Sequence, residues 1–173
     1  MKFVTEKHGN NPDKGNFDAD FPRIAFLNAT CGWTAMQPQS PHRNLLMVMA
    51  DDLVRKTIFH GLTGLLERND MLSFQGKKWA WENSTKTGFR SAPMCLADGR
   101  RIIEFYLEHK QRGTKVLTVS CEYGKSRSVT TANFLQAVDQ GLSPPADTDA
   151  PNEHISRQLR MAWDEHLKRQ SRV

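Results

Sequence analysis

Cys121 and Arg127 stand at the two ends of a short polar segment, SCEYGKSRS at 120–128, that follows an apolar run. Gly124, whose backbone can adopt conformations closed to other residues, lies between them. In a tight loop between a strand and a helix, consecutive backbone N–H groups and the helix dipole bind a tetrahedral oxyanion. A guanidinium adds two parallel hydrogen bonds, and the same field stabilises a cysteine thiolate. The segment therefore predicts a nucleophile and its anion-binding site in one loop.

A nucleotide-binding loop is the other interpretation of this segment, because Lys125 and Ser126 follow Gly124. The GxxxxGK[ST] pattern cradles phosphates with backbone amides. That pattern needs a second glycine at the position of Val119. The nucleotide-binding interpretation is therefore excluded, and the Cys-x5-Arg-Ser spacing remains.

The elements that must hold this loop alternate between strand and helix patterns. The apolar run KVLTV at 115–119 predicts a strand, and a helix is predicted to begin near Ser126 and to stop at Gly141. Other strands are expected at 21–29 and 44–50, and other helices at 53–67, at 98–110 and from Pro151. This alternation is typical of an α/β fold with a central, mostly parallel sheet flanked by helices. The Cys121 loop would then lie at the carboxyl end of a central strand, where such sheets bind ligands.

Each of these helices is expected to bury one apolar face. In the helix at 98–110 the predicted core positions are Ile102, Ile103, Tyr106 and Leu107. In the helix that begins near Ser126 they are Val129, Ala132, Leu135 and Val138, and in the helix from Pro151 they are Ile155, Leu159, Ala162, Trp163 and Leu167.

Length and composition indicate how many domains the chain forms and whether it crosses a membrane. A chain of 173 residues with 38% hydrophobic content is of single-domain size. Residues 1–20 are polar and predict a flexible N-terminal arm, which leaves 21–173 as one domain. The chain shows neither an apolar leader nor a run long enough to cross a bilayer, so we expect a cytoplasmic protein without a membrane partner.

Charge and cysteine content narrow the expected partners. The 24 Lys and Arg residues against 19 Asp and Glu residues give a net charge of +5, which mildly favours anionic partners. The cysteines are Cys31, Cys95 and Cys121, an odd and widely spaced set without a CxxC pair. This pattern argues against a disulfide framework and a structural zinc site, and it predicts at least one free thiol. Cys31 and Cys95 are interpreted as core residues.

The segment 120–128 resembles the signature loop HCxxGxxR[ST] of the cysteine-dependent protein tyrosine and dual-specificity phosphatases. It matches at Cys121, Gly124, Arg127 and Ser128, and it departs at Ser120, where the family usually has histidine. A histidine there helps to orient the loop and favours the thiolate, so serine implies a higher thiol pKa and a slower enzyme.

The resemblance extends beyond the loop to small bacterial and phage members of the dual-specificity group. The strand that ends in ADD at 50–52, the helix at 98–110 and the later PNEHISRQL at 151–159 are similar in order and type. The similarity covers about 22–52 and 97–168, so the phosphatase-like domain would carry an insertion at about 53–96.

The family chemistry implied by this resemblance proceeds in two steps through a cysteinyl-phosphate, without metal or cofactor. Cys121 would attack phosphorus while Arg127 and the loop amides hold the phosphoryl oxygens, and Ser128 would stabilise the thiolate as it departs. The residues expected to bind substrate are Glu122, Tyr123, Gly124, Lys125, Ser126 and Arg127.

A general acid must come from elsewhere in the chain. In the family it follows the strand before the signature helix, which points to Asp51 or Asp52, and by analogy with members that have two consecutive aspartates we favour Asp52. Asp98 is the third candidate, although a helix-capping role is preferred for it. The remaining carboxylates of the insertion are Glu67, Asp70 and Glu82.

Three functions stay open at this point. The first is a phosphomonoesterase that acts on phosphorylated protein. The second is the same chemistry on a non-protein substrate such as an RNA 5′ phosphate or an inositol phosphate, which the basic charge supports and the acidic Glu122 in the loop opposes. The third is a catalytically weak phosphate-binding module.

Overall fold

The computed structural model of the chain describes residues 1–7, 21–27, 44–50 and 94–171. The strands are β1 (Lys2–Lys7), β2 (Arg23–Leu27), β3 (Leu45–Met49) and β4 (Val116–Cys121). The helices are α4 (Leu96–Gln111), α5 (Arg127–Asp139) and α6 (Glu153–Gln170), with a short 3-10 helix, η2 (Asp147–Asp149). The fold of this part of the chain is α/β, as the sequence predicts. The helix predicted at 53–67 lies outside the described residues.

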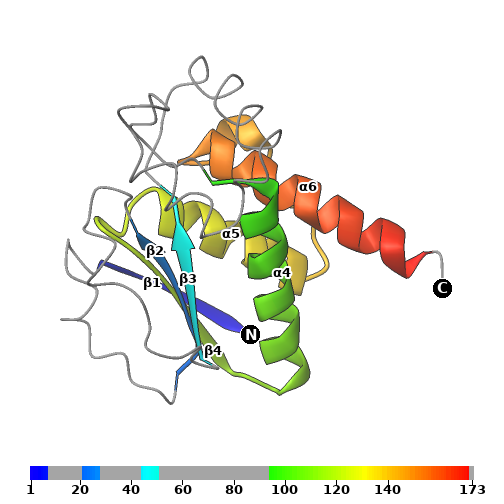
Figure 1. Ribbon diagram of the computed structural model, residues 1–173, viewed down its shortest axis with the longest axis horizontal. Helices are drawn as coiled ribbons and strands as arrows, with labels where there is room; N and C mark the ends of the chain where they lie inside the picture. Colours follow the sequence, from blue (N-terminus) through cyan, green and yellow to red (C-terminus); the bar gives the residue numbers. More distant parts are fainter. Residues whose placement is uncertain (8–20, 28–43, 51–93, 172–173) are drawn as a thin grey trace, which may run out of the picture.

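The four strands form one parallel sheet in the order β1-β4-β2-β3 (Figure 1). β4 is an interior strand that pairs with β1 on one side and with β2 on the other. Consecutive residues of β2 (RIAFL) and β4 (VLTVSC) are buried, as is typical of parallel strands that are covered on both faces. Because the carboxyl ends of parallel strands meet at one edge of the sheet, the segment after β4 lies beside the ends of β1 and β2.

The three helices lie on one side of the sheet and pack against one another (Figure 1). α6 covers α4 and contacts α5, while α5 lies over β1 and β4. Most of the predicted core positions are buried: Ile102, Ile103, Tyr106, Ala132, Leu135, Val138, Ile155, Leu159 and Ala162. The amphipathic patterns of α4 and α6 therefore predict which faces the two helices bury.

The prediction of a flexible arm at 1–20 is wrong for the first residues, because Lys2–Lys7 form the edge strand β1. The strand pairs with β4 from Lys2 opposite Val116 to Lys7 opposite Cys121. Phe3 packs against the core, with its ring 6.2 Å from the ring of Tyr106. The backbone pairing with β4 stabilises this strand, although its polar side chains do not show the apolar pattern from which a strand is predicted. Residues 8–20 lie outside the described residues.

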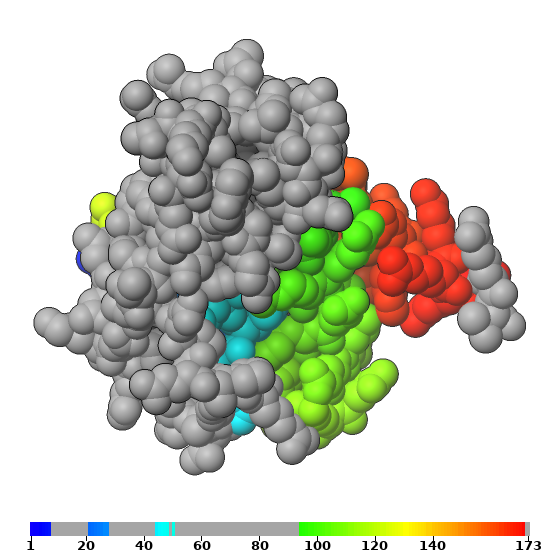
Figure 2. All heavy atoms as spheres, in the orientation of Figure 1, coloured from blue at the N-terminus to red at the C-terminus, as the bar shows by residue number. Residues whose placement is uncertain are grey.

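Each of the three predicted helix faces also needs a correction, and in α4 it is Leu107, which is only half-buried. In α5, Val129 is only half-buried, and Thr130 and Thr131 are buried beside Phe134. In α6, Trp163 is half-buried and Leu167 is 45% exposed. Figure 2 shows the reason, because the end of α6 (red) projects beyond α4 (green).

An ionic cluster lies near the amino-terminal end of β1, at the end of the sheet opposite to the Cys121 loop. The Asp139 carboxylate at the end of α5 accepts hydrogen bonds from the Met1 amino group at 2.6 Å and from the Tyr106 hydroxyl at 3.0 Å, and it lies 2.9 Å from the Lys110 ammonium. Burial raises the pKa of Asp139, but these three donors together lower it to about 2. The cluster joins β1, α4 and α5 far from the Cys121 loop. Among the described helices, none has the length and apolarity to cross a bilayer.

Candidate functional site

The loop at 122–126 connects the carboxyl end of β4 to the first residue of α5. Cys121 is the last residue of β4, opposite Lys7 of β1, and its neighbour Ser120 is opposite Ala25 of β2. The site residues predicted at 121–128 therefore lie together at the ligand-binding edge of the sheet, between a strand and a helix N-terminus.

Gly124 is required by the path of this loop. Its φ is +68°, in the left-handed region that favours glycine. A Cβ atom at this position would lie 3.2 Å from the carbonyl carbon and oxygen of Glu6 and from the amide nitrogen of Lys7. The loop turns tightly around Cys121 because it passes directly against the backbone at the end of β1.

The Cys121 thiol is held in a polar setting although only 1% of the residue is exposed. The Ser128 Oγ lies 3.1 Å from Sγ, and the backbone N–H groups of Ser128 and Gly124 also donate to the sulfur. Burial raises the pKa of Cys121, but these hydrogen bonds and the charge of Arg127 outweigh it, so the net pKa falls below the ordinary thiol value. The arrangement stabilises a thiolate, which is a nucleophile.

Arg127 is fully buried at the start of α5. Its Nη1 donates to the carbonyl oxygen of Ala50 at 2.6 Å, and its Nη2 lies 3.9 Å from Oε2 of Glu122. A guanidinium has five donors in a fixed plane, so the hydrogen bond to Ala50 and the ion pair with Glu122 both restrict its orientation. The contact with Ala50 joins the loop to the end of β3, and no sequence pattern predicts it because the acceptor is a backbone atom far away in the chain.

The outer face of the loop carries exposed side chains. Tyr123 is 59% exposed and Lys125 is also exposed, whereas the Glu122 side chain is only 14% exposed. The Tyr123 hydroxyl donates to the Glu122 carboxylate, which raises the pKa of Tyr123. Tyr123 and Lys125 are therefore available to a bound molecule, while Glu122 faces inward toward Arg127.

The N-terminus of α6 supports the loop from behind. The Asn152 backbone N–H donates to Thr130 Oγ1 at 2.9 Å, and its side-chain Nδ2 donates to Ser126 Oγ at 3.4 Å. His154 donates through Nε2 to the carbonyl oxygen of Met94 at 2.8 Å, so it is a structural residue. Sequence reasoning missed Asn152, although its position before a helix is a capping signal.

The three candidate acids separate into two groups. Asp98 is buried in the first turn of α4, and its Oδ2 accepts a hydrogen bond from the Cys95 backbone N–H at 2.9 Å, so the capping role is confirmed. Asp51 and Asp52 lie outside the described residues, as do Glu67, Asp70 and Glu82. Ala50, which Arg127 contacts, immediately precedes Asp51 in the chain.

Ser120 is fully buried in β4, and its Oγ has no hydrogen-bond partner among the described residues. Its hydroxyl therefore has no contact with the described part of the loop that could replace an orienting histidine. Cys95 is buried at the start of α4 with a free thiol, as expected of a core cysteine, and Cys31 lies outside the described residues.

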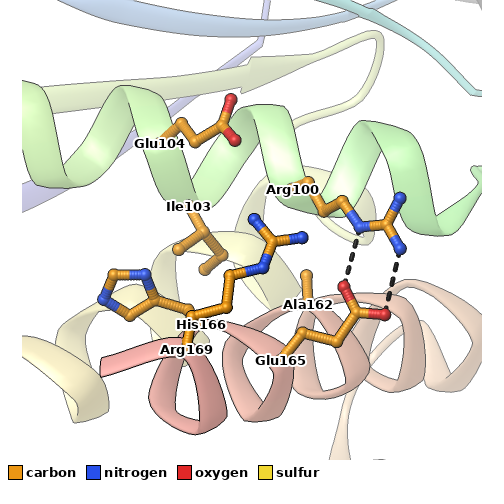
Figure 3. A pocket seen from close by; sticks show the side chains of 7 residues that line it. All are labelled: Arg100, Ile103, Glu104, Ala162, Glu165, His166 and Arg169. Carbon is orange, nitrogen blue, oxygen red and sulfur yellow. Dashed lines mark hydrogen bonds and ion pairs between the residues drawn. The ribbon is translucent and has the colours of Figure 1, made fainter. Parts of the chain in front are cut away.

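A hollow lies between α4 and α6, away from the Cys121 loop (Figure 3). Arg100 of α4 spans it by donating through Nε and Nη2 to both carboxylate oxygens of Glu165 in α6, at 2.7 and 3.0 Å. The hydrogen bond from Arg100 lowers the pKa of Glu165. The other residues around the hollow are Ile103, Glu104, Ala162, His166 and Arg169. This partly exposed ion pair joins α6 to α4.

The part of the chain that the structure describes contains no group of three or more His, Cys, Asp and Glu residues suited to hold a metal ion. No protein family, no curated protein and no solved structure matches the chain.

Proposed function

We propose that the chain is a cysteine-dependent phosphomonoesterase of the protein tyrosine and dual-specificity phosphatase type. The observation that carries this proposal is the convergence of three groups in one loop. The sulfur of Cys121 receives hydrogen bonds from Ser128 and from backbone amides, and the buried Arg127 stands at the first turn of the following helix. A stabilised thiolate beside a fixed guanidinium fits in-line attack on a phosphate monoester.

In the first step, the Cys121 thiolate forms a bond to phosphorus and the bond between phosphorus and the ester oxygen breaks. The leaving oxygen takes a proton from the general acid, and the products are an alcohol or phenol and a cysteinyl-phosphate. Arg127 and the loop amides hold the equatorial oxygens, where negative charge is spread in the transition state.

In the second step, water forms a bond to phosphorus and the bond between phosphorus and sulfur breaks. The deprotonated acid accepts a proton from this water, and inorganic phosphate is released with the Cys121 thiolate restored. The Ser128 hydroxyl, 3.1 Å from the sulfur, donates to the thiolate as it departs and so makes it a better leaving group.

Asp52 is our proposed general acid, with Asp51 as the alternative. The hydrogen bond from Arg127 to the Ala50 carbonyl supports this choice, because it ties the anion-binding guanidinium to the backbone just before both aspartates. Asp52→Asn should slow hydrolysis of esters with poor leaving groups by about a hundredfold or more, and should affect activated aryl esters less. If Asp51→Asn shows that dependence and Asp52→Asn does not, the two roles are exchanged.

The exposed side chains of the loop, Tyr123 and Lys125, are compatible with several classes of phosphate ester, so the substrate class is tested by comparison of substrates. Phosphate release should be compared for a phosphotyrosine peptide, a phosphothreonine peptide and a 5′-triphosphorylated RNA, with Cys121→Ser as the blank. We expect the peptides to be the better substrates, because Glu122 adds a negative charge to the loop. A preference for the RNA would assign the same chemistry to nucleic acid, and phosphate binding without turnover of any substrate would overturn the proposal in favour of a binding module.

A further inference from the structure

Glu122 is the one acidic residue inside the loop at 122–126, where a negative charge opposes the binding of an anion. The carboxylate does not extend into solvent. It is 14% exposed, its Oε2 lies 3.9 Å from Nη2 of the fully buried Arg127, and it accepts a hydrogen bond from the Tyr123 hydroxyl. A mostly buried carboxylate in an anion-binding loop needs a reason to be there.

We propose that Glu122 is a positioning residue that holds the Arg127 guanidinium in the plane needed to bind the phosphoryl oxygens. This inference rests on the proposed function, since it assigns Glu122 a part in the same reaction. Glu122 would act through Arg127 and would not touch the substrate with its carboxylate.

The geometry supports this role because Arg127 is constrained from two sides. The Ala50 carbonyl, just after β3, accepts from Nη1 at 2.6 Å, and the Glu122 carboxylate, just after β4, lies 3.9 Å from Nη2. A hydrogen bond to Nη1 and an ion pair beside Nη2 act on different nitrogens, so together they restrict the plane of the guanidinium more than the hydrogen bond does by itself. A bidentate interaction with a phosphate depends on that plane.

The Tyr123 hydroxyl completes the arrangement. Its interaction with the Glu122 carboxylate raises the pKa of Tyr123, so the two side chains lie close together on this side of the loop. The Glu122 carboxylate faces the Arg127 guanidinium, which compensates its negative charge. The loop supplies both the binding cation and the anion that orients it.

The test compares Glu122→Gln with a matched control, Glu108→Gln. Glu108 also pairs with an arginine, Arg112, but on the exposed part of α4. We expect Glu122→Gln to lower kcat on an aryl phosphate by about fivefold to thirtyfold, and Glu108→Gln to leave it unchanged. In an Arg127→Lys background, Glu122→Gln should change kcat by less than about twofold, because the group on which it acts is gone.

A second measurement does not depend on turnover. In a sample with isotope-labelled arginine, the Arg127 side-chain N–H signal is assigned by its loss in Arg127→Lys. We expect this signal to be sharp and slowly exchanging in the unmodified chain, to broaden in Glu122→Gln and to stay sharp in Glu108→Gln. Glu122→Asp keeps the charge but shortens the side chain, and should give an intermediate signal.

Two results would overturn the inference: an unchanged Arg127 signal in Glu122→Gln, or an equal loss of kcat with and without Arg127. If the unmodified chain hydrolyses no phosphate ester, the proposed function fails instead, and the signal of Arg127 still decides whether Glu122 positions it.

Discussion

Substitution of Ser128 by alanine removes the hydroxyl that lies 3.1 Å from the Cys121 sulfur. The structure opposes two effects at this thiol. Burial raises the pKa of Cys121, and the Ser128 hydroxyl is the first of the groups that lower it, ahead of the backbone amides and Arg127. Without the hydroxyl, burial is opposed by fewer donors, so the pKa of Cys121 should rise.

A hydrogen bond to a charged group contributes about 1.5 to 3 kcal/mol. Because the amides of Ser128 and Gly124 and the charge of Arg127 remain, we expect the lower end of that range. At a fixed pH below the titration midpoint, the thiolate fraction should fall by about tenfold to thirtyfold. The acid limb of the kcat/KM profile should accordingly move to higher pH.

The assay is a pH titration of the thiolate ultraviolet absorbance, with the signal of Cys121→Ser subtracted to remove the other thiols. Thr131→Ala is the matched control, because Thr131 lies on the same helix and its Oγ1 is buried without a hydrogen-bond partner among the described residues. If Ser128→Ala titrates as Thr131→Ala does, the hydroxyl does not stabilise the thiolate and the reasoning is refuted.

Three further changes test other parts of the account. Arg127→Lys replaces a planar fork with a point charge, so kcat should fall by about a hundredfold to a thousandfold, and unchanged kinetics on aryl phosphates would show that Arg127 does not bind substrate. Gly124→Ala adds both positive-φ strain and a contact with the end of β1, so urea unfolding should show a larger loss of stability than Gly113→Ala, whose Cβ meets nothing within 4 Å; equal losses would contradict the close approach. Asp139→Asn removes a carboxylate with a pKa of about 2, lowered from 3.8. Its stabilisation, at most about 2 kcal/mol, is present above the unfolded pKa and is lost as pH falls through the folded pKa. The stability difference from the unmodified chain should therefore disappear between about pH 4 and pH 2, and a difference that persists below pH 2 would refute this assignment.

The sequence predicts the elements that carry their own apolar pattern. β2, β3 and β4 are short and rich in Ile, Leu and Val, and α4 and α6 have clear amphipathic faces, so their positions and most of their buried residues follow from the residues alone. β1 does not follow, because the polar segment KFVTEK is held by backbone pairing with a strand more than a hundred residues away in the chain.

In the candidate site too, the local features follow from the sequence and the contacts with distant residues do not. The spacing of Cys121, Gly124 and Arg127 predicts a loop with an anion-binding geometry, because glycine and a helix start constrain the backbone locally. Of the two contacts on Arg127, the one with Ala50 is tertiary and the one with Glu122 is local. The carbonyl of Ala50 carries no side-chain signal, and Glu122 by its type alone suggests a charge that weakens anion binding.

The most direct test of Cys121 as the nucleophile is a rapid acid quench during turnover of a radiolabelled phosphate ester. We expect covalent phosphate on the peptide that contains Cys121, at a level that depends on substrate and disappears in Cys121→Ser. Trapped phosphate should increase in Ser128→Ala, because departure of the thiolate in the second step is slower. Turnover without label on Cys121, or label on another residue, would contradict the assignment of Cys121 as the nucleophile.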